Sequence, residues 1–184
     1  MPVISVNGNI AALCPKQVVK LSKQIKAKLE VNLFYSNEKR KISIIKTLKK
    51  NGANEILGIK TTSSKKLPGI DSARRIVDKD GIFVADVVVV PLEDGDRTMA
   101  LRKAGKIVIT FDLNPLSRTS QTANITIVDN ITRAIDLLII ESKKLSKKNQ
   151  KNLQKIIDDF DNKENLRKNI IQIKNNLDRR AKIA

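Results

Sequence analysis

Polar side chains of several kinds gather between Lys106 and Asn130. A β-branched run, Ile107 to Thr110, precedes an eight-residue stretch, 112–119, that contains a carboxylate, a carboxamide, two hydroxyls and a guanidinium. These groups belong to Asp112, Asn114, Ser117, Arg118 and Thr119. A second β-branched run, Ile125 to Val128, ends at Asp129 and Asn130. An ordinary turn does not need such a set, so the stretch predicts one side of a ligand crevice, with Arg118 able to form a bidentate contact to phosphate.

The alternative for this stretch is that the side chains only stabilise their own backbone. Asp112 to Thr119 would then be a capped loop stiffened by Pro115, and Asn130 would be the N-cap of the following helix. We favour ligand binding for the loop and leave both roles of Asn130 equally open. In either case the helix after Asn130 directs its N-terminal N–H groups toward the crevice.

The segment Ser5 to Asn9 reads as a strand end, Asn-Gly-Asn, and a helix start. This layout presents backbone N–H groups to an anion, and Gly8 permits close approach of the backbone. Neither a six-residue dinucleotide fingerprint nor a P-loop is present, so an ordinary strand-to-helix turn remains the alternative. We expect a substrate phosphate near Asn7, Gly8 and Asn9.

An acidic cluster follows the most hydrophobic predicted strand. Glu93, Asp94 and Asp96 surround Gly95, with Arg97 next in the chain. Carboxylates this close repel one another unless they share a cation or a hydrogen-bond donor. The cluster therefore predicts a site for Mg²⁺ or for the ammonium group of a substrate. An acidic helix start capped by Asp96 is the equally weighted alternative.

Strand-like and helix-like segments alternate along residues 1–145. Predicted strands are Val3–Val6, Val31–Phe34, Ile56–Ile59, Ala85–Val90, Ile107–Thr110 and Ile125–Val128, and predicted helices are Gln17–Leu29, Glu38–Asn51, Arg97–Ala104 and Ile131–Leu145. Residues 60–82 read as a long excursion with one helical turn near Ser72 to Ile76. The pattern predicts an α/β domain with three layers and a Rossmann-like, mostly parallel sheet. Ligands of such sheets bind beyond the carboxyl ends of the strands.

Residues 146–184 differ from the rest and predict a C-terminal helical hairpin. The first apolar stripe is Leu153, Ile156, Ile157 and Phe160, and the second is Leu166, Ile170, Ile173 and Leu177. The second stripe has heptad-like spacing, which is typical of a surface that packs on the domain or on a second subunit. The predicted division is therefore a ligand-binding domain, 1–145, and a helical extension, 146–184.

Composition narrows the chemistry. The chain has no histidine, which removes the commonest general base and most zinc sites. One cysteine, no apolar run of transmembrane length and no signal peptide fit a reducing cytoplasm. The formal net charge of +17 suits a basic nucleic-acid-binding module, but stacking aromatics are scarce, so we favour a solvated lysine-rich surface.

Several long motifs together resemble one family, the archaeal 4-phosphopantoate–β-alanine ligases, also called phosphopantothenate synthetases. The motifs are SVNGNIAAL, EVNLFY, PLEDGDRT, DLNPLSRT, TITIVDNITRAI and DDFDNKENLR, and they cover nearly the whole chain in order. The resemblance implies a homodimeric α/β enzyme of coenzyme A biosynthesis. It would join (R)-4-phosphopantoate to β-alanine while converting ATP, with Mg²⁺, to AMP and diphosphate. The nucleotide contacts it implies are Asp112, Leu113, Asn114, Arg118, Thr119, Asn130 and Ile131.

The chain departs from the family pattern at its N-terminus. Family members carry a further, mostly helical segment before the motif PVISVNGN, and this segment contributes contacts to ATP and covers the substrate. A start codon placed too late, a fragment and a truncated, non-catalytic paralogue are the three explanations, and the strand that begins at residue 2 favours a fragment. We expect the chain alone to bind nucleotide weakly, with Arg118 as the catalytic contact to phosphate.

Overall fold

A six-stranded parallel sheet forms the centre of the computed structural model, which describes residues 1–59 and 61–183. Its strands are β1 (Pro2–Val6), β2 (Lys28–Val31), β3 (Ile56–Leu57), β6 (Val87–Val89), β7 (Ile107–Phe111) and β8 (Ile125–Ile127). They lie in the order β3-β2-β1-β6-β7-β8, and each pairing in the sheet is parallel. This is the order of a doubly wound Rossmann fold, so the predicted α/β class is confirmed.

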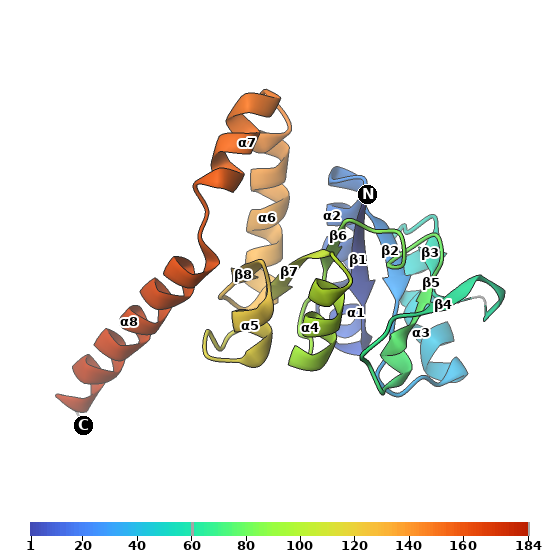
Figure 1. Cartoon of the computed structure of the whole chain (residues 1–184), viewed down its shortest axis with the longest axis horizontal. Helices are drawn as coiled ribbons and strands as arrows, with labels where there is room; N and C mark the ends of the chain where they lie inside the picture. Colours follow the sequence, from blue (N-terminus) through green and yellow to red (C-terminus); the bar gives the residue numbers. More distant parts are fainter. Residues whose placement is uncertain (60, 184) are drawn as a thin grey trace.

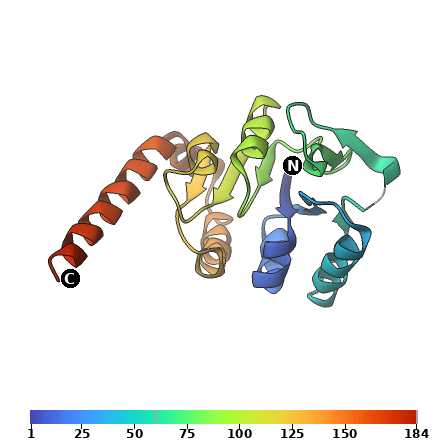
Figure 2. The same ribbon diagram turned by 90° about the horizontal axis from the view of Figure 1, so that it is seen from below.

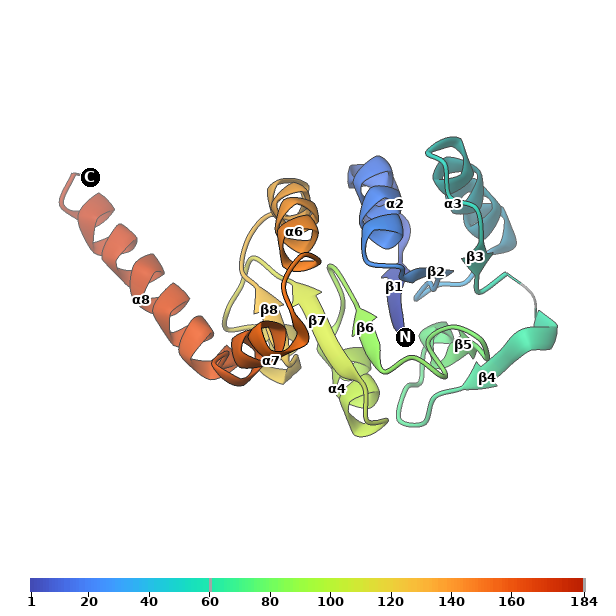
Figure 3. The same ribbon diagram turned by 90° about the horizontal axis from the view of Figure 1, so that it is seen from above.

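Helices cover both faces of the sheet, giving the three predicted layers (Figure 3). On one face lie α2 (Pro15–Gln24), α3 (Glu38–Lys50) and α6 (Ile131–Leu145), and α1 (Gly8–Leu13) leads into α2. On the other face lie α4 (Gly95–Lys103) and α5 (Arg118–Thr122). Successive side chains of each strand point to opposite faces of the sheet, so the strands contribute to two separate hydrophobic cores. Ile4 packs on the α2 side of the sheet, whereas Val3 packs on the α4 side.

The second strand starts three residues earlier than its sequence predicts. The predicted helix Gln17–Leu29 ends at Gln24, and Lys26 adopts a positive φ of 53°, which turns the chain into β2. Within β2, Leu29 and Val31 are buried in the core, but Glu30 between them is also fully buried. The glutamate interrupts the apolar run by which a buried strand is recognised in a sequence. For this reason the predicted helix wrongly extends to Leu29.

The excursion between β3 and β6 forms a small structure of its own. It contains η1 (Thr61–Ser63), β4 (Ser64–Lys66), η2 (Ala73–Arg75) and β5 (Ile76–Asp78), and β4 pairs with β5 in an antiparallel sheet that the sequence does not predict. η2 confirms the predicted helical turn. Glu30 anchors this excursion, because its carboxylate accepts the N–H groups of Asp78 (3.1 Å) and Ile82 (2.7 Å). Burial raises the pKa of Glu30 to about 7, although these hydrogen bonds oppose the shift.

The C-terminal helices, α7 (Gln150–Asp158) and α8 (Asn162–Ala181), form in the predicted place, but they follow one another instead of lying side by side as in a hairpin (Figure 1). α8 runs away from the domain and packs on α5 and β8 through its first turns only (Figures 1 and 2). Asn162 donates to Ser120 O and Ala123 O and accepts the N–H of Thr126. The later stripe residues stay open, since Leu177 is 62% exposed. The division at residue 145 stays a prediction.

Across the described residues, every helix is too short or too polar to cross a membrane.

Candidate functional site

The carboxyl ends of the parallel strands lie along one edge of the sheet, which is the lower edge in Figure 1 and faces the viewer in Figure 2. The chain adds strands in one direction from β1 to β3 and in the other direction from β6 to β8. A crevice for ligands is expected where this order reverses, between β1 and β6. The four predicted polar segments follow β1, β6, β7 and β8, which are consecutive in the sheet. The fold therefore brings all four to one continuous edge.

Asn7, which follows β1, has a structural role: its side chain joins the start of α1 to the segment after β6. Its Oδ1 accepts the N–H of Ile10 at 3.1 Å and so caps α1. Its Nδ2 donates to Pro91 O and Leu92 O, both at 3.2 Å, across the strand-order reversal. Because these bonds occupy the buried amide, its side chain is not available to a substrate, and the phosphate predicted near Asn7 would rest on backbone N–H groups. The backbone of Gly8 and Asn9 remains available to an anion.

Arg40, a cation whose place in a lysine-rich helix gives no sign of a role, lies against this turn. The guanidinium of Arg40, on α3, approaches Gly8 so closely that a Cβ there would lie 2.7 Å from Nη2. Arg40 is exposed, and no ion pair is recorded for it among the described residues. A Cβ at position 8 would displace only the flexible end of the exposed Arg40 side chain, so the contact does not require glycine but does place a cation beside the turn. This gives the predicted anion site at Gly8 and Asn9 a positive charge from a different helix.

The acidic segment after β6 is neutralised by arginines. Glu93, whose side chain is 1% exposed, pairs with Arg97 at 2.6 Å and with Arg74. Arg97 is fully buried and also donates to Ser5 Oγ at 3.1 Å. Burial raises the pKa of Glu93, and the two guanidinium groups oppose this shift. For Asp94, hydrogen bonds from Arg97 N–H and Arg74 outweigh the effect of burial and leave the pKa below its usual range.

These pairs correct the prediction of a Mg²⁺ or ammonium site on Glu93, Asp94 and Asp96. Glu93 and Asp94 face arginines, and Asp96 pairs with Arg118 at 2.5 Å on the surface. The N-cap of α4 is Asp94, whose Oδ1 accepts the N–H of Arg97, and not Asp96. Within residues 1–59 and 61–183, no group of three or more acidic or cysteine side chains could hold a metal ion. We also expected Arg97 to contact the substrate; in the structure its side chain is fully buried and pairs with Glu93, and that contact stays a prediction.

The loop after β7 is partly held by its own side chains, as the alternative interpretation predicts. Asp112 accepts from Asn114 N at 2.9 Å and from Ser117 Oγ, and Ser117 caps α5. Thr119 is buried and donates to Glu93 O at 2.9 Å, which joins this loop to the β6 segment. Arg118 is different, since its side chain is 66% exposed and Asp96 is the sole ion-pair partner recorded for it in the described chain.

The start of α6 follows β8. Asn130 is confirmed as its N-cap, because Oδ1 accepts the N–H of Thr132 at 3.0 Å. Ile131 is 2% exposed and belongs to the core, so only its backbone can face a ligand. Asp129 pairs with Arg133 four residues later, and the hydrogen bond from Arg133 holds the pKa of this carboxyl below its usual range. The segment thus offers helix N–H groups rather than free side chains.

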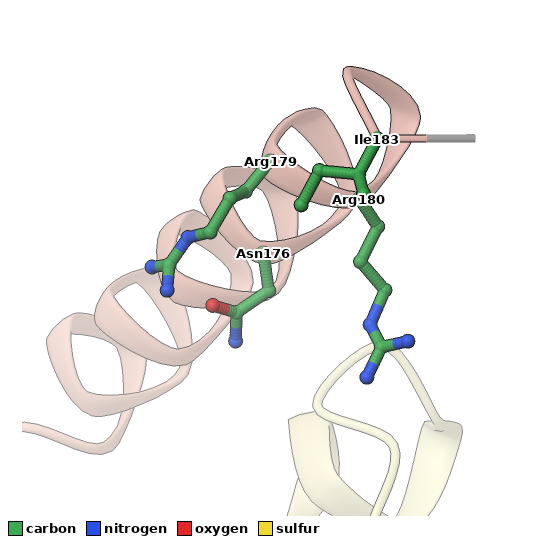
Figure 4. A pocket seen from close by; sticks show the side chains of 4 residues that line it. All are labelled: Asn176, Arg179, Arg180 and Ile183. Carbon is green, nitrogen blue, oxygen red and sulfur yellow. The ribbon is translucent and has the colours of Figure 1, made fainter.

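A hollow of about 720 Å³ lies elsewhere, beside the last turns of α8 (Figure 4). Its lining is Asn176, Arg179, Arg180 and Ile183, and all four side chains come from this helix or the residues just after it. The two arginine side chains extend away from each other, so they do not converge on a ligand. We do not count this surface as part of the candidate site.

Strand order and the row of polar segments at the carboxyl ends of β1, β6, β7 and β8 define the chain as a Rossmann-type α/β protein. The phosphopantothenate/pantothenate synthetase family matches residues 1–176, and the chain belongs to this family. It is 49% identical to the 4-phosphopantoate–β-alanine ligase of Thermococcus kodakarensis over 181 residues, which are 98% of this chain and 69% of that relative. The corresponding ligase of Methanosarcina mazei is 49% identical over 176 residues, 96% of this chain and 68% of that protein.

Proposed function

We propose that the protein catalyses the ATP-dependent condensation of (R)-4-phosphopantoate with β-alanine to 4′-phosphopantothenate, AMP and diphosphate, a step of coenzyme A biosynthesis. Membership of the family and the similarity to the two ligases support this reaction. The observation that carries the proposal to this chain is the continuous polar edge from β1 to β8. The comparisons do not favour the alternatives of a nucleic-acid-binding module or a non-catalytic paralogue.

ATP is proposed to lie across the ends of β7 and β8. Asp112, Leu113 and Asn114 would contact the nucleoside, and Thr119, Asn130 and Ile131 would offer backbone groups and define the shape of the site. Arg118 would contact phosphate. Its present partner is the exposed Asp96, and an exposed ion pair contributes only about 0–1 kcal/mol. A bidentate contact with phosphate is stronger, so ATP can displace Asp96 from Arg118 at little cost.

The reaction needs positioning more than covalent chemistry from the protein. The carboxylate of 4-phosphopantoate attacks the α-phosphorus of ATP, and the bond to the β-phosphate oxygen breaks to release diphosphate. The amine of β-alanine then attacks the acyl carbon of the adenylate, and AMP leaves with the acyl C–O electron pair. Arg118 would stabilise charge that develops on the phosphate, and Gly8 and Asn9 with Arg40 would hold an anionic group of the substrate. A site without histidine suits such a reaction, because the protein positions the reactants and stabilises charge and needs no general base of that kind.

The fit of a Mg²⁺ ion is limited. The acidic cluster after β6 is committed to arginines, and the described residues offer no ready-made group of three carboxylates. We therefore assign no protein ligands to the metal. Mg²⁺ commonly keeps several waters and binds through substrate phosphates with one or two carboxylates, which is compatible with this edge.

A homodimer is also part of the proposal, and the C-terminal helices support it. Large apolar side chains on α6, α7 and α8 are 40% exposed or more, as in Leu137 (58%), Ile157 (64%) and Leu177 (62%). Exposed apolar side chains in such number are typical of helices that pack on a partner. Sedimentation of the protein at micromolar concentration would test this point, and a monomer would contradict it.

The test of the function is AMP release in the presence of ATP, 4-phosphopantoate and β-alanine. Arg118→Ala should remove about 2–4 kcal/mol of transition-state stabilisation, which lowers kcat/KM roughly 30- to 1,000-fold. Arg102→Ala is the matched control, because Arg102 is also exposed but lies in the last turn of α4, away from the edge. The assay uses the protein with a family N-terminal segment restored. Unchanged AMP release by Arg118→Ala would exclude Arg118 from the mechanism, and a protein with that segment and Arg118 intact that releases no AMP would refute the function.

A further inference from the structure

The backbone pairing that joins the two halves of the sheet stops before the ligand edge. β1 stays paired with β2 as far as Val6 and Val31, but its pairing with β6 ends two residues earlier, at Ile4 and Val89. This is the point where the strand order reverses and a ligand crevice is expected. Past the last pair, the hydrogen bonds recorded in the described chain between the segments after β1 and β6 come from side chains. Side chains therefore hold the two sides of the crevice together.

The segment after β6 belongs to the nucleotide half of the edge. The N–H group of Leu92 donates to Phe111 O at 3.3 Å, which continues the connection with β7 past the end of β6. The hydroxyl of Thr119 donates to Glu93 O at 2.9 Å and joins the segment to the loop after β7. A movement of this segment would therefore also move the residues proposed to contact ATP.

Asn7 connects this segment to the other side of the crevice. Its Nδ2 donates to Pro91 O and Leu92 O, both at 3.2 Å, while its Oδ1 accepts the N–H of Ile10 and caps α1. The residue is 5% exposed, and these bonds fix its amide in one orientation, because only the nitrogen can donate to two carbonyls. α1 begins with the turn at residues 8–9, where an anionic group of the substrate is proposed to bind. One buried side chain thus joins that turn to the nucleotide half.

The peptide that accepts Asn7 is held in an uncommon conformation. Leu92 has a φ of 52°, in the left-handed region that residues other than glycine rarely adopt. Its N–H is bonded to Phe111 O, its carbonyl to Asn7, and its side chain packs on the core at the α2 side of the sheet. Strained backbone of this kind persists only where its surroundings fix it, and it gathers at functional sites. The position of this peptide is therefore defined from both sides of the crevice.

We propose that Asn7 is a positioning residue, which sets the distance between the two reactants without touching either; this assignment rests on the proposed function. In that function an anionic group of 4-phosphopantoate lies at Gly8 and Asn9, and ATP lies across β7 and β8, so the reactants bind to different halves of the sheet. Their reacting atoms must approach to about 3–3.5 Å, and a displacement of about 1 Å can lower the rate roughly 100-fold. The amide of Asn7 spans the two halves and so controls this distance.

This role differs in its kinetic signature from the two alternatives. If Asn7 only stabilised the fold, a folded variant would keep its turnover rate. If Asn7 bound a substrate, its loss would raise KM for that substrate. A positioning role predicts that kcat and kcat/KM fall by the same factor while each substrate binds as before, because the contact matters only when both reactants are aligned.

Asn7→Ser separates the two functions of this side chain. Serine caps a helix about as well as asparagine, so α1 keeps its cap, but the single hydroxyl lies one bond closer to the backbone and cannot also cross the crevice. Asn124→Ser is the matched control. Asn124 Oδ1 accepts the N–H of Val108 at 2.8 Å and also holds the sheet, but it precedes β8 and so lies at the opposite edge.

Leu92→Gly is a second variant, which acts on the other end of the connection. Glycine adopts the same positive φ without strain, so the backbone of the folded state is retained. The peptide that accepts Asn7 then loses the side chain that anchors it to the core, and it is free to rotate. This variant carries the test by the same criteria if Asn7→Ser does not fold.

Each variant is made in the protein with a family N-terminal segment restored, and its melting temperature shows whether it folds. AMP release gives kcat and KM, and calorimetry gives the dissociation constants of ATP and 4-phosphopantoate separately. We expect Asn7→Ser to lower kcat about 10- to 100-fold, with KM and both dissociation constants unchanged, and Leu92→Gly to act in the same way. Asn124→Ser should lower the melting temperature and keep the wild-type kcat.

A folded Asn7→Ser variant with the wild-type kcat, or one that raises KM for one substrate at an unchanged kcat, would overturn the assignment. The unsubstituted protein separates this failure from that of the function. If it releases AMP and the folded variants turn over normally, only the role of Asn7 is wrong. If it releases no AMP, the proposed function and the positioning role are both refuted.

Discussion

Replacing Glu93 by glutamine is expected to destabilise the fold by about 3–5 kcal/mol, the usual cost of removing one partner from a buried ion pair. The side chains of Glu93 and Arg97 are 1% and 0% exposed, so water cannot compensate the arginine. After the change Arg97 has no carboxylate partner and keeps only neutral acceptors, the amide oxygen at position 93 and Ser5 Oγ at 3.1 Å, whereas Arg74 keeps Asp94. Most of the loss therefore comes from one guanidinium left buried without a counter-charge.

The reverse change should be milder, and this asymmetry is the sharper part of the prediction. Arg97→Met leaves Glu93 paired with Arg74 and bonded to the N–H of Asp94, so the remaining charge is still neutralised. Glu38→Gln is the control, because Glu38 is 74% exposed and should change stability by less than about 0.5 kcal/mol. The chain has no tryptophan, so urea unfolding is best followed by far-ultraviolet circular dichroism. A Glu93→Gln variant within 1 kcal/mol of the wild type, or an Arg97→Met variant that is the less stable of the two, would refute the reasoning.

Three further predictions concern other buried groups. The pKa of Glu30 is raised by burial from 4.5 to about 7, so the native state binds the extra proton and stability should fall as pH rises from about 4.5 to about 7, by up to roughly 3 kcal/mol. Glu30→Gln should flatten this slope in urea titrations at several pH values, and an unchanged slope would contradict the assignment. Burial, and then the charge of Asp136, raise the pKa of the Cys14 thiol to about 11. Ellman's reagent should therefore react with this thiol only after the protein unfolds. Fast reaction of the native protein would show instead that the thiol is accessible. Asn162→Ala removes the anchor of α8 and should speed amide hydrogen exchange in that helix by about tenfold or more, while exchange in β1 stays as it was.

The fold class follows from the sequence because its signals are local and repeated. The helix Ile131–Leu145 is predicted to the residue, since an N-cap at Asn130 and an apolar stripe agree on its start and face. Placing four polar segments on one edge also needs no structure, because the carboxyl ends of parallel strands meet there. What the sequence supports best is therefore the order of elements and the side of the sheet on which ligands bind.

The partners of the polar residues could not be predicted, because sequence spacing does not report burial. Arg74 lies 20 residues from Asp94 inside an excursion without periodicity, yet it neutralises the acidic cluster. Asn7 and Arg97 have the residue types of a binding site and are in fact used inside the protein. For Lys41 the sequence misleads in the other direction. Its helix has the pattern of an ordinary lysine-rich surface, but in the structure Lys41 lines a cavity.

The reversal of strand order between β1 and β6 has a consequence for how the chain folds. Paired residues in the other strand contacts of the sheet lie 16 to 27 positions apart, but Pro2 pairs with Val87 across 85 positions. Closing the longer loop costs about 1 kcal/mol more in chain entropy, so each half of the sheet can assemble before the two halves join. The joint between them follows the crevice, and Asn7 ties it at the ligand edge. Substrates that contact both halves of the sheet would connect two units that form separately. The protein should therefore unfold more slowly when these substrates are bound.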